Sequence, residues 1–210
     1  MTISRKGTAM VTDASSGIGA IYADRLARRG YDLVLVARNC DRLHDLAKRL
    51  THETGRTAKV VSADLGAEAD LGRIEALLRS DVSISLLVNN AGVGVAGPLA
   101  ESDVDKMEDM IALNVRALTR LACAAVPGFV SRGGGTIINI ASGTIAPEIL
   151  NGVYAGTRAF VLALSLALHK ELADMNVDVQ FWDRRTSDRT FAAPDRDAGQ
   201  LHDRCRTCRP

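Results

Sequence analysis

The segment "TAMVTDASSGIG", residues 8–19, joins a short apolar run to two closely spaced glycines. The run at 8–12 has the composition of a buried strand, and a helical pattern of apolar residues begins directly after Gly19. A tight turn between a strand and a helix gathers free backbone N–H groups at the positive end of the helix dipole, which suits a phosphate. Two glycines spaced in this way also occur in purely structural turns, so the segment by itself leaves both interpretations open.

The rest of the chain repeats the same alternation of strand and helix. Further apolar runs rich in Val, Ile and Leu lie at 32–37, 58–63, 84–90, 135–142 and 177–182. Helical patterns lie between them at 17–29, 40–54, 68–79, about 104–131 and about 152–174. Nearly continuous apolar runs are typical of strands that are buried on both faces of a parallel sheet. The sequence therefore predicts an α/β fold with a doubly wound, Rossmann-type parallel sheet.

Composition divides the chain into one domain, residues 1–182, and a polar tail, residues 183–210. The tail holds seven Arg and five Asp but no Lys, Glu, Val or Ile, and we expect it to be disordered. Its His202, Cys205 and Cys208 would supply three zinc ligands, but the tail offers no evident fourth ligand or rigid frame. We therefore expect no metal site.

The overall charge excludes some classes of partner. With 26 basic and 25 acidic residues the net charge is +1, which gives no field to attract nucleic acid or an anionic membrane.

The longest apolar stretch, 159–168, is shorter than the roughly 20 residues of a membrane span, and no signal peptide is evident at the N-terminus. The four cysteines show no disulfide-framework spacing. A cytoplasmic protein whose partners are small molecules or further copies of itself is expected.

Four later motifs stand in a fixed order behind the first loop: "NNAG" at 89–92, Asn114 in "LNV", "IAS" ending at Ser142, and "YAGTR" at 154–158. Together they resemble the short-chain dehydrogenase/reductase family. That family carries a T-G-x-x-x-G-x-G loop, N-N-A-G after the fourth strand, an Asn in the next long helix, a Ser ending the fifth strand, and Y-x-x-x-K. The resemblance covers about 180 residues and favours the phosphate-loop interpretation.

The resemblance implies a dinucleotide site at the ends of the first four strands. The phosphates would lie on the loop, and the adenosine would contact Asp64 and the "NNAG" segment. The implied residues are Thr12, Ser15, Ser16, Gly17, Ile18, Gly19, Asp64, Asn90 and Gly92. From the residues alone, Asp64 also fits a strand-end cap and "NNAG" a plain turn.

Arg38 follows the second strand, where an NAD-binding protein usually carries an acid for the ribose 2′-hydroxyl. An arginine there suits a 2′-phosphate, so NADP is the expected cofactor rather than NAD. A solvated surface arginine is the alternative.

The reaction that the resemblance implies is the interconversion of a carbonyl and an alcohol. Ser142 would polarise the carbonyl, Tyr154 would act as general acid or base, and Asn114 would support a water relay. Arg158 stands where the family has a lysine that stabilises the tyrosinate and holds the nicotinamide ribose, so Tyr154 and Arg158 would both contact the cofactor. In the family the two long helices form a dimer interface, which implies a homodimer or homotetramer.

The sequence departs from the family pattern in three places. Asp13 replaces the first glycine of the loop: it would either repel a 2′-phosphate or accept hydrogen bonds from the N–H groups of its own turn. Arg158 keeps the positive charge of the lysine but does not readily release a proton. The Pro-Gly turn, substrate segment and seventh strand that usually follow are absent or altered after residue 182. A catalytically inactive nucleotide-binding or oligomerising protein therefore remains the alternative function.

Overall fold

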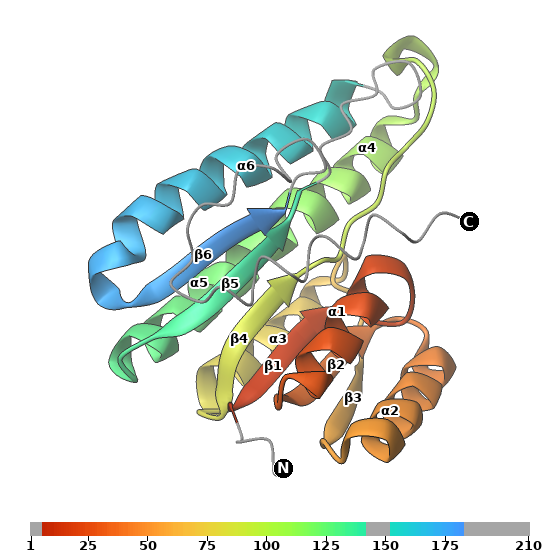
Figure 1. The fold of residues 1–210 in the computed structure, drawn as a ribbon. Helices are drawn as coiled ribbons and strands as arrows, with labels where there is room; N and C mark the ends of the chain where they lie inside the picture. Colours follow the sequence, from red (N-terminus) through yellow and green to blue (C-terminus); the bar gives the residue numbers. More distant parts are fainter. Residues whose placement is uncertain (1–5, 142–151, 183–210) are drawn as a thin grey trace.

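A six-stranded parallel sheet forms the centre of the protein (Figure 1). The computed structural model describes residues 6–141 and 152–182. The strands run in the order β3-β2-β1-β4-β5-β6, and every pair is parallel. Their bounds are β1 Thr8–Thr12, β2 Asp32–Ala37, β3 Ala58–Ser62, β4 Ile84–Asn89, β5 Gly135–Ile140 and β6 Val177–Trp182. The predicted doubly wound fold is confirmed.

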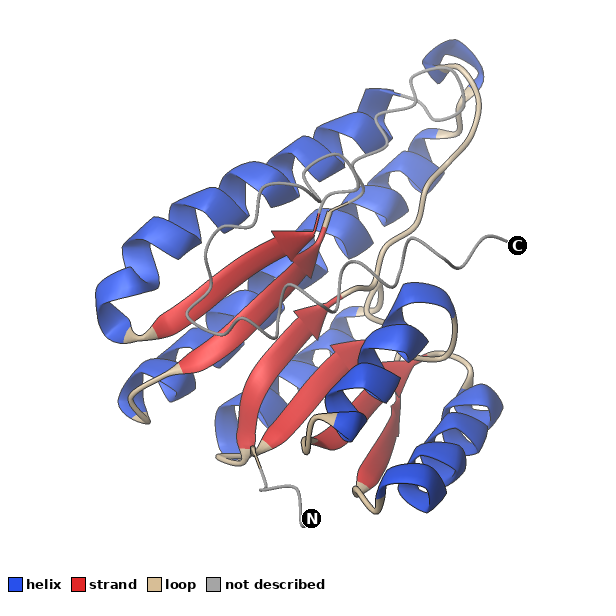
Figure 2. Cartoon of the chain, viewed as in Figure 1, coloured by secondary structure: helices blue, strands red, loops and turns tan. Residues whose placement is uncertain are grey.

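Helices cover both faces of this sheet (Figure 2). The α-helices are α1 Gly17–Arg28, α2 Cys40–Thr54, α3 Glu68–Ser80, α4 Val104–Ile111, α5 Leu118–Ser131 and α6 Gly152–Leu172. Short 3-10 turns lie at η1 Leu99–Glu101 and η3 Ala173–Met175, and a π-helical turn, η2 Ala112–Ala117, separates α4 from α5. The single long helix predicted for 104–131 is thus interrupted in its middle. Single π turns inside helices are frequent at functional sites.

The two faces of the sheet build two apolar cores because neighbouring residues of a strand point to opposite sides. Val11 of β1 packs with helices α1 and α2, whereas Met10 packs with α3 and α5. Both side chains are fully buried, as are Leu33 and Leu87. Burying one such side chain contributes roughly 1.5–3 kcal/mol, and this explains why the strands read as continuous apolar runs.

Two helical stretches are long and apolar enough to cross a membrane by length and composition, Val104–Ser131 and Gly152–Met175. In the most apolar 18 residues of each stretch, 44% of the first and 22% of the second are buried within the protein, and α5 packs on β4 and β5 of the sheet. Core helices of soluble proteins pass the same test, so these two stretches are weak evidence for a membrane span.

The strand order places a topological switch between β1 and β4, whose carboxyl ends lie side by side. In doubly wound sheets ligands bind in the crevice at such a switch point. Most of the predicted site residues follow the carboxyl ends of β1 to β4 or lie on α6. Ser142 and the tail at 183–210, including His202, Cys205 and Cys208, lie outside the described residues.

Candidate active site

Thr12, at the end of β1, ties the loop to the "NNAG" segment. Its hydroxyl donates to the carbonyl of Val88 at 3.2 Å and accepts from the backbone N–H groups of Asn90 at 2.9 Å and Ala91 at 3.0 Å. The side chain is 1% exposed. Thr12 therefore positions two parts of the site through its hydroxyl, and a direct cofactor contact by Thr12 stays a prediction.

The loop after Thr12 is held closely from several sides. The side-chain amide of Asn90 donates to the carbonyl oxygens of Thr12 at 3.1 Å and Asp13 at 3.3 Å. The backbone N–H of Ala14 donates to the carbonyl of Val36 at 3.2 Å. A Cβ on Gly19 would lie 2.2 Å from the carbonyl oxygen of Asp13, so only glycine permits this approach of α1 to the loop.

Asp13 has a backbone φ of 49°, in the left-handed region that glycine adopts without cost. Asp13 lines a groove together with Arg38 and Asp64, and within the described residues its carboxylate makes no hydrogen bond to its own turn. Burial raises the pKa of the Asp13 carboxyl, and the nearby Arg38 guanidinium opposes that rise. Of the two placements open from the sequence, the structure favours the carboxylate that faces the groove.

The N-terminus of α1 differs from those of the next three helices. Helix α1 has no side-chain cap and no acidic residue in its first turn. In contrast, α2, α3 and α4 each have an acid in the first turn, and side chains cap α2 and α4. An uncapped helix N-terminus that begins at Gly17, with a φ of 53°, fits an anion such as a nucleotide phosphate.

The groove runs along the carboxyl ends of β1, β2, β3 and β4. Its lining residues are Asp13, Ala37, Arg38, Ala63, Asp64, Leu65, Ala91, Gly92, Val93 and Leu113. Arg38 is exposed and is available to a ligand. Asp64 accepts a hydrogen bond from the N–H of Gly66 at 3.0 Å, so it serves as the strand-end cap and lines the groove as well.

Asn114 lies in the π turn and is fully buried. Its side-chain oxygen accepts from the N–H of Val93 at 2.9 Å, and its side-chain nitrogen donates to the carbonyl of Val93 at 2.8 Å and to the hydroxyl of Thr157 at 3.1 Å. Thr157 in turn donates to the carbonyl of Tyr154 at 2.7 Å. The amide of Asn114 thus joins the groove to α6, and its part in a water relay stays a prediction.

Tyr154 and Arg158 are in contact, as their spacing of four residues on α6 predicts. The guanidinium carbon of Arg158 lies 5.0 Å from the centre of the Tyr154 ring, over its face. Arg158 Nη1 donates to the carbonyl of Ile140 at 3.3 Å. Its Nε is buried and, among the described residues, has no hydrogen-bond partner. The cation is therefore held against the ring by a cation–π contact and a strand-end carbonyl.

Gly92 connects the groove with this pair. It lines the groove, and a Cβ at its position would lie 2.5 Å from Arg158 Nη2 and 3.1 Å from Asn114 Oδ1. The missing side chain makes the room that the arginine head group occupies. Loop, groove, Asn114, Arg158 and Tyr154 form one continuous site at the carboxyl ends of the strands, whereas Ser142 lies outside the described residues.

Three buried side chains around Tyr154 were not predicted from the sequence. Met107 and Met110 of α4 pack against Tyr154, and Thr157 links it to Asn114. The spacing of Thr157, three residues after Tyr154 on the same helix face, was the available indication. Nothing in the local pattern of α4 distinguishes the two methionines from ordinary core residues.

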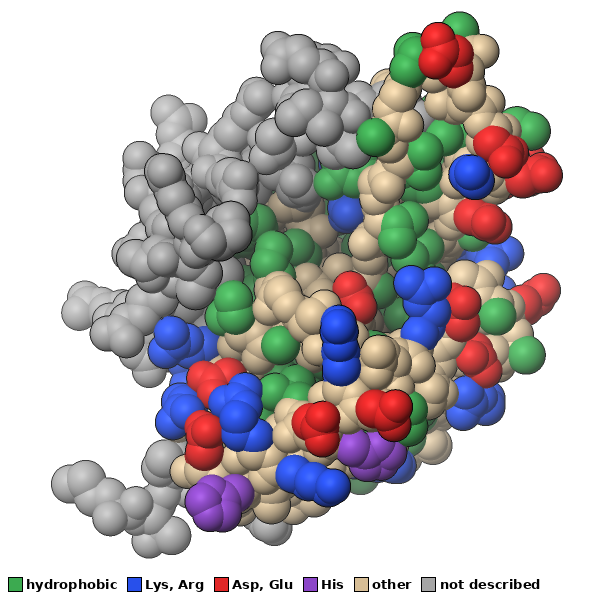
Figure 3. All heavy atoms as spheres, turned by 90° about the vertical axis from the view of Figure 1, so that its right-hand side faces the viewer, with side chains coloured by type: hydrophobic (Ala, Val, Ile, Leu, Met, Phe, Trp, Pro, Cys, Tyr) green, Lys and Arg blue, Asp and Glu red, His purple; other side chains and the backbone are tan. Residues whose placement is uncertain are grey.

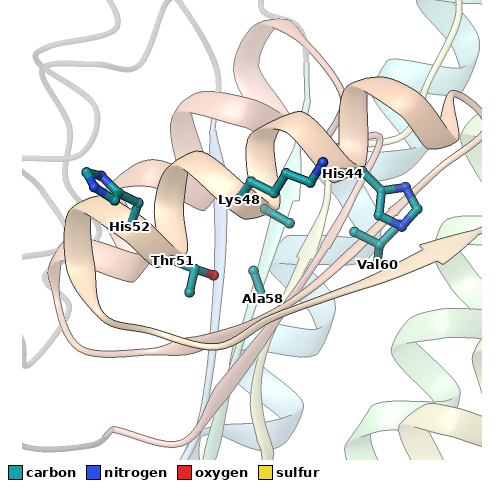
Figure 4. A pocket seen from close by; sticks show the side chains of 7 residues that line it. His44, Lys48, Thr51, His52, Ala58 and Val60 are labelled. Atoms are coloured by element: carbon teal, nitrogen blue, oxygen red, sulfur yellow. The ribbon is translucent and has the colours of Figure 1, made fainter.

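A second pocket lies between α2 and the edge strand β3, away from these residues (Figure 4). His44, Lys48 and His52 line it from one side of α2, and Ala58 and Val60 line it from the strand.

On the face shown in Figure 3, acidic and basic side chains are interspersed and no patch of one sign dominates. Within residues 6–141 and 152–182, no three His, Cys, Asp or Glu side chains are grouped to hold a metal ion.

Comparisons with known proteins agree with this geometry. The family model for short chain dehydrogenase matches residues 7–183. An uncharacterized oxidoreductase of Staphylococcus epidermidis is 34% identical over 177 residues, which cover 83% of this chain and 75% of that protein. A very-long-chain 3-oxoacyl-CoA reductase of Anas platyrhynchos is 35% identical over 178 residues, covering 82% of this chain but 57% of the reductase.

Solved structures are similar over most of the fold. A bulky-bulky ketone specific alcohol dehydrogenase from Comamonas testosteroni superposes with a TM-score of 0.83 at 41% identity, covering 95% of this chain and 81% of that chain. A short-chain dehydrogenase from Sphingobium yanoikuyae in complex with NADPH has a TM-score of 0.81 at 46% identity, covering 84% and 70%. The family model and these relatives together show that the chain belongs to the short-chain dehydrogenase/reductase family of oxidoreductases.

Proposed function

We propose that the protein interconverts a carbonyl and an alcohol with NADP(H) as cofactor. The contact between Gly92 and Arg158 carries the proposal, because it makes the nucleotide groove continuous with the ring of Tyr154. Structures of the Sphingobium relative and of L-sorbose reductase from Gluconobacter frateurii contain NADPH. Arg38 and the uncapped N-terminus of α1 fit the phosphates of such a nucleotide.

The residues of this chain have separable roles in the proposal. When bound, the nicotinamide supplies or accepts the hydride. Tyr154 gives a proton to the developing alkoxide or takes it from the alcohol, and Arg158 stabilises the negative charge of the tyrosinate. The Nε of Arg158, which has no partner in the part of the chain that the structure describes, suits a ribose hydroxyl, and Ser142 is proposed to polarise the carbonyl. Asn114 fixes the backbone of Val93 next to the groove.

The first test measures NADPH oxidation with a panel of ketones, aldehydes and 3-oxoacyl compounds. We expect saturable turnover that Tyr154→Phe lowers by about 10²–10⁴-fold, with NADPH affinity little changed. Absence of turnover with every acceptor, despite saturable NADPH binding, would exclude the proposed catalysis.

A catalytically inactive nucleotide-binding protein is the second candidate, since the head group of Arg158 stacks on the ring and holds its protons tightly. Arg158→Lys distinguishes the two. A rise in turnover at unchanged NADPH affinity places the limitation in proton transfer. If neither the wild type nor Arg158→Lys turns over any acceptor, the second candidate is favoured.

The proposal also includes an oligomeric state and a cellular location. A homodimer or homotetramer through the two long helices is proposed, and exposed apolar side chains on α6, Phe160 and Leu166, suit such an interface. Sedimentation equilibrium tests the assembly. A cytoplasmic location is proposed on the same sequence grounds as above.

A further inference from the structure

Asp13 is the acidic side chain of the phosphate loop, and among the described residues it shares the groove lining with a single basic side chain, Arg38. The backbone of Asp13 has little freedom to move, because three contacts hold it. The amide of Asn90 holds its carbonyl, α1 approaches that carbonyl at Gly19, and the next residue, Ala14, is bonded to β2. The fixed φ of 49° then determines where the side chain leaves the loop.

Arg38 is fixed relative to Asp13 by the same strand. The bond from Ala14 to Val36 joins the loop to β2 two residues before Arg38. The positive charge of Arg38 is close enough to the Asp13 carboxyl to lower its pKa, which opposes the rise caused by burial. Within the described residues no other group neutralises Asp13 more directly, since its carboxylate makes no hydrogen bond and no ion pair there.

We propose that Asp13 is a specificity-determining residue of the nucleotide groove, where its carboxylate competes with a 2′-phosphate for Arg38 and lowers the preference for NADP(H) over NAD(H). This inference rests on the proposed function. A 2′-phosphate carries roughly two negative charges. It would approach the Arg38 guanidinium, whose positive charge is already balanced by the Asp13 carboxylate. NAD(H) carries a 2′-hydroxyl instead, which meets no such repulsion. The groove then binds both nucleotides with more similar affinity than its arginine alone would allow.

The test compares the dissociation constants of NADPH and NADH for the wild type, Asp13→Asn and Asp13→Gly by calorimetry, without substrate. Asn keeps the size of the side chain and tolerates the left-handed region, so it removes the charge alone. We expect Asp13→Asn to tighten NADPH binding by about tenfold while NADH binding changes by less than about threefold. The gain should shrink at high ionic strength, because salt screens the charge of an exposed groove.

Glu108→Gln on α4 is the matched control, since it removes one exposed carboxylate that is not part of the groove lining. It should leave the ratio of the two dissociation constants unchanged. If Asp13→Asn also leaves that ratio unchanged while both nucleotides bind, the inference is wrong and the proposed function stands. A gain with Asp13→Gly but none with Asp13→Asn assigns the effect to the Cβ and likewise overturns the inference. If the wild type binds neither nucleotide, the proposed function itself fails.

Discussion

The proposed phosphate loop and the proposed reaction centre around Tyr154 each contain one side chain that departs from the family pattern, and each accommodates it differently. In the loop, the backbone of Asp13 is fixed by Asn90 and Gly19, while its carboxylate has no bonded partner among the described residues. In the reaction centre, Arg158 stands on a regular helix, and its head group is held by the Tyr154 ring and by Ile140. The position of Asp13 is thus determined by backbone packing, whereas the position of Arg158 is determined by contacts of its head group.

The largest effect is expected where this backbone packing is disturbed. In Gly19→Ala the new Cβ would lie 2.2 Å from the Asp13 carbonyl oxygen, and no flexible side chain can move aside to relieve the clash. We expect a loss of about 2–3 kcal/mol of unfolding free energy and at least about a tenfold loss of nucleotide affinity. Chemical denaturation and calorimetry measure the two quantities.

Gly72→Ala provides the reference for that variant. Gly72 is a glycine of α3 with open space around its Cβ position, so alanine should be neutral or should stabilise the helix by up to about 1 kcal/mol. Equal behaviour of Gly19→Ala and Gly72→Ala would show that the loop is not rigid.

Gly92→Ala tests the side-chain half of the comparison. Its Cβ would meet the far end of Arg158, which can move, together with the amide of Asn114 at 3.1 Å. We expect stability to change by less than about 1 kcal/mol while turnover falls by about tenfold, because small displacements in a reaction centre are costly. An unchanged rate would mean that the position of Arg158 does not matter for turnover.

A smaller effect is expected outside both regions, where Glu75 of α3 pairs with Arg120 of α5 and, at 3.2 Å, with Arg79. Hydrogen bonding from Arg120 lowers the pKa of the Glu75 carboxyl. Its stabilising contribution is therefore present above the unfolded value of about 4.3 and is lost as the pH falls through the folded value. Glu75→Gln should cost about 1–2 kcal/mol at pH 7 and less at pH 4.

Glu108→Gln, which removes an exposed carboxylate of α4, is the control for Glu75→Gln and should change stability by less than about 0.5 kcal/mol. Urea denaturation at both pH values measures the difference. A cost for Glu75→Gln that does not depend on pH would show that packing, not charge, joins α3 and α5 at this pair.

The sequence was sufficient to predict the fold because apolar residues recur with different spacings in strands and in helices. Every predicted strand lies within two residues of an observed one, and Gly55, at a φ of 69°, ends α2 where the helical pattern stops. The π turn was not predictable, because "ALNVRA" contains neither a proline nor a glycine and keeps the apolar pattern of a helix. Only the packing around Asn114 distinguishes it.

The site was predicted as a set of positions but not as a set of contacts. The motifs identified Thr12, Asn90 and Gly92, yet Thr12 acts through the backbone of its neighbours and Gly92 by leaving space for Arg158. Spacing along a chain cannot show which hydroxyl is already bonded, or which side-chain end fills a gap between distant segments. For the same reason the sequence left the direction of the Asp13 carboxylate open, and the loop geometry favours one of its two alternatives.

The π turn at Ala112–Ala117 amounts to one residue more than a regular helix would need between α4 and α5. Each residue of an α-helix turns the chain by about 100°. The same extra residue in a regular helix would rotate α4, with Met107 and Met110, by about a quarter of a circle relative to α5, and the wider π turn absorbs this rotation locally. The surroundings of Tyr154 thus depend on the length of the chain as well as on its composition. An alignment with a relative that lacks the extra residue keeps α4 in register only if its gap lies within Ala112–Ala117.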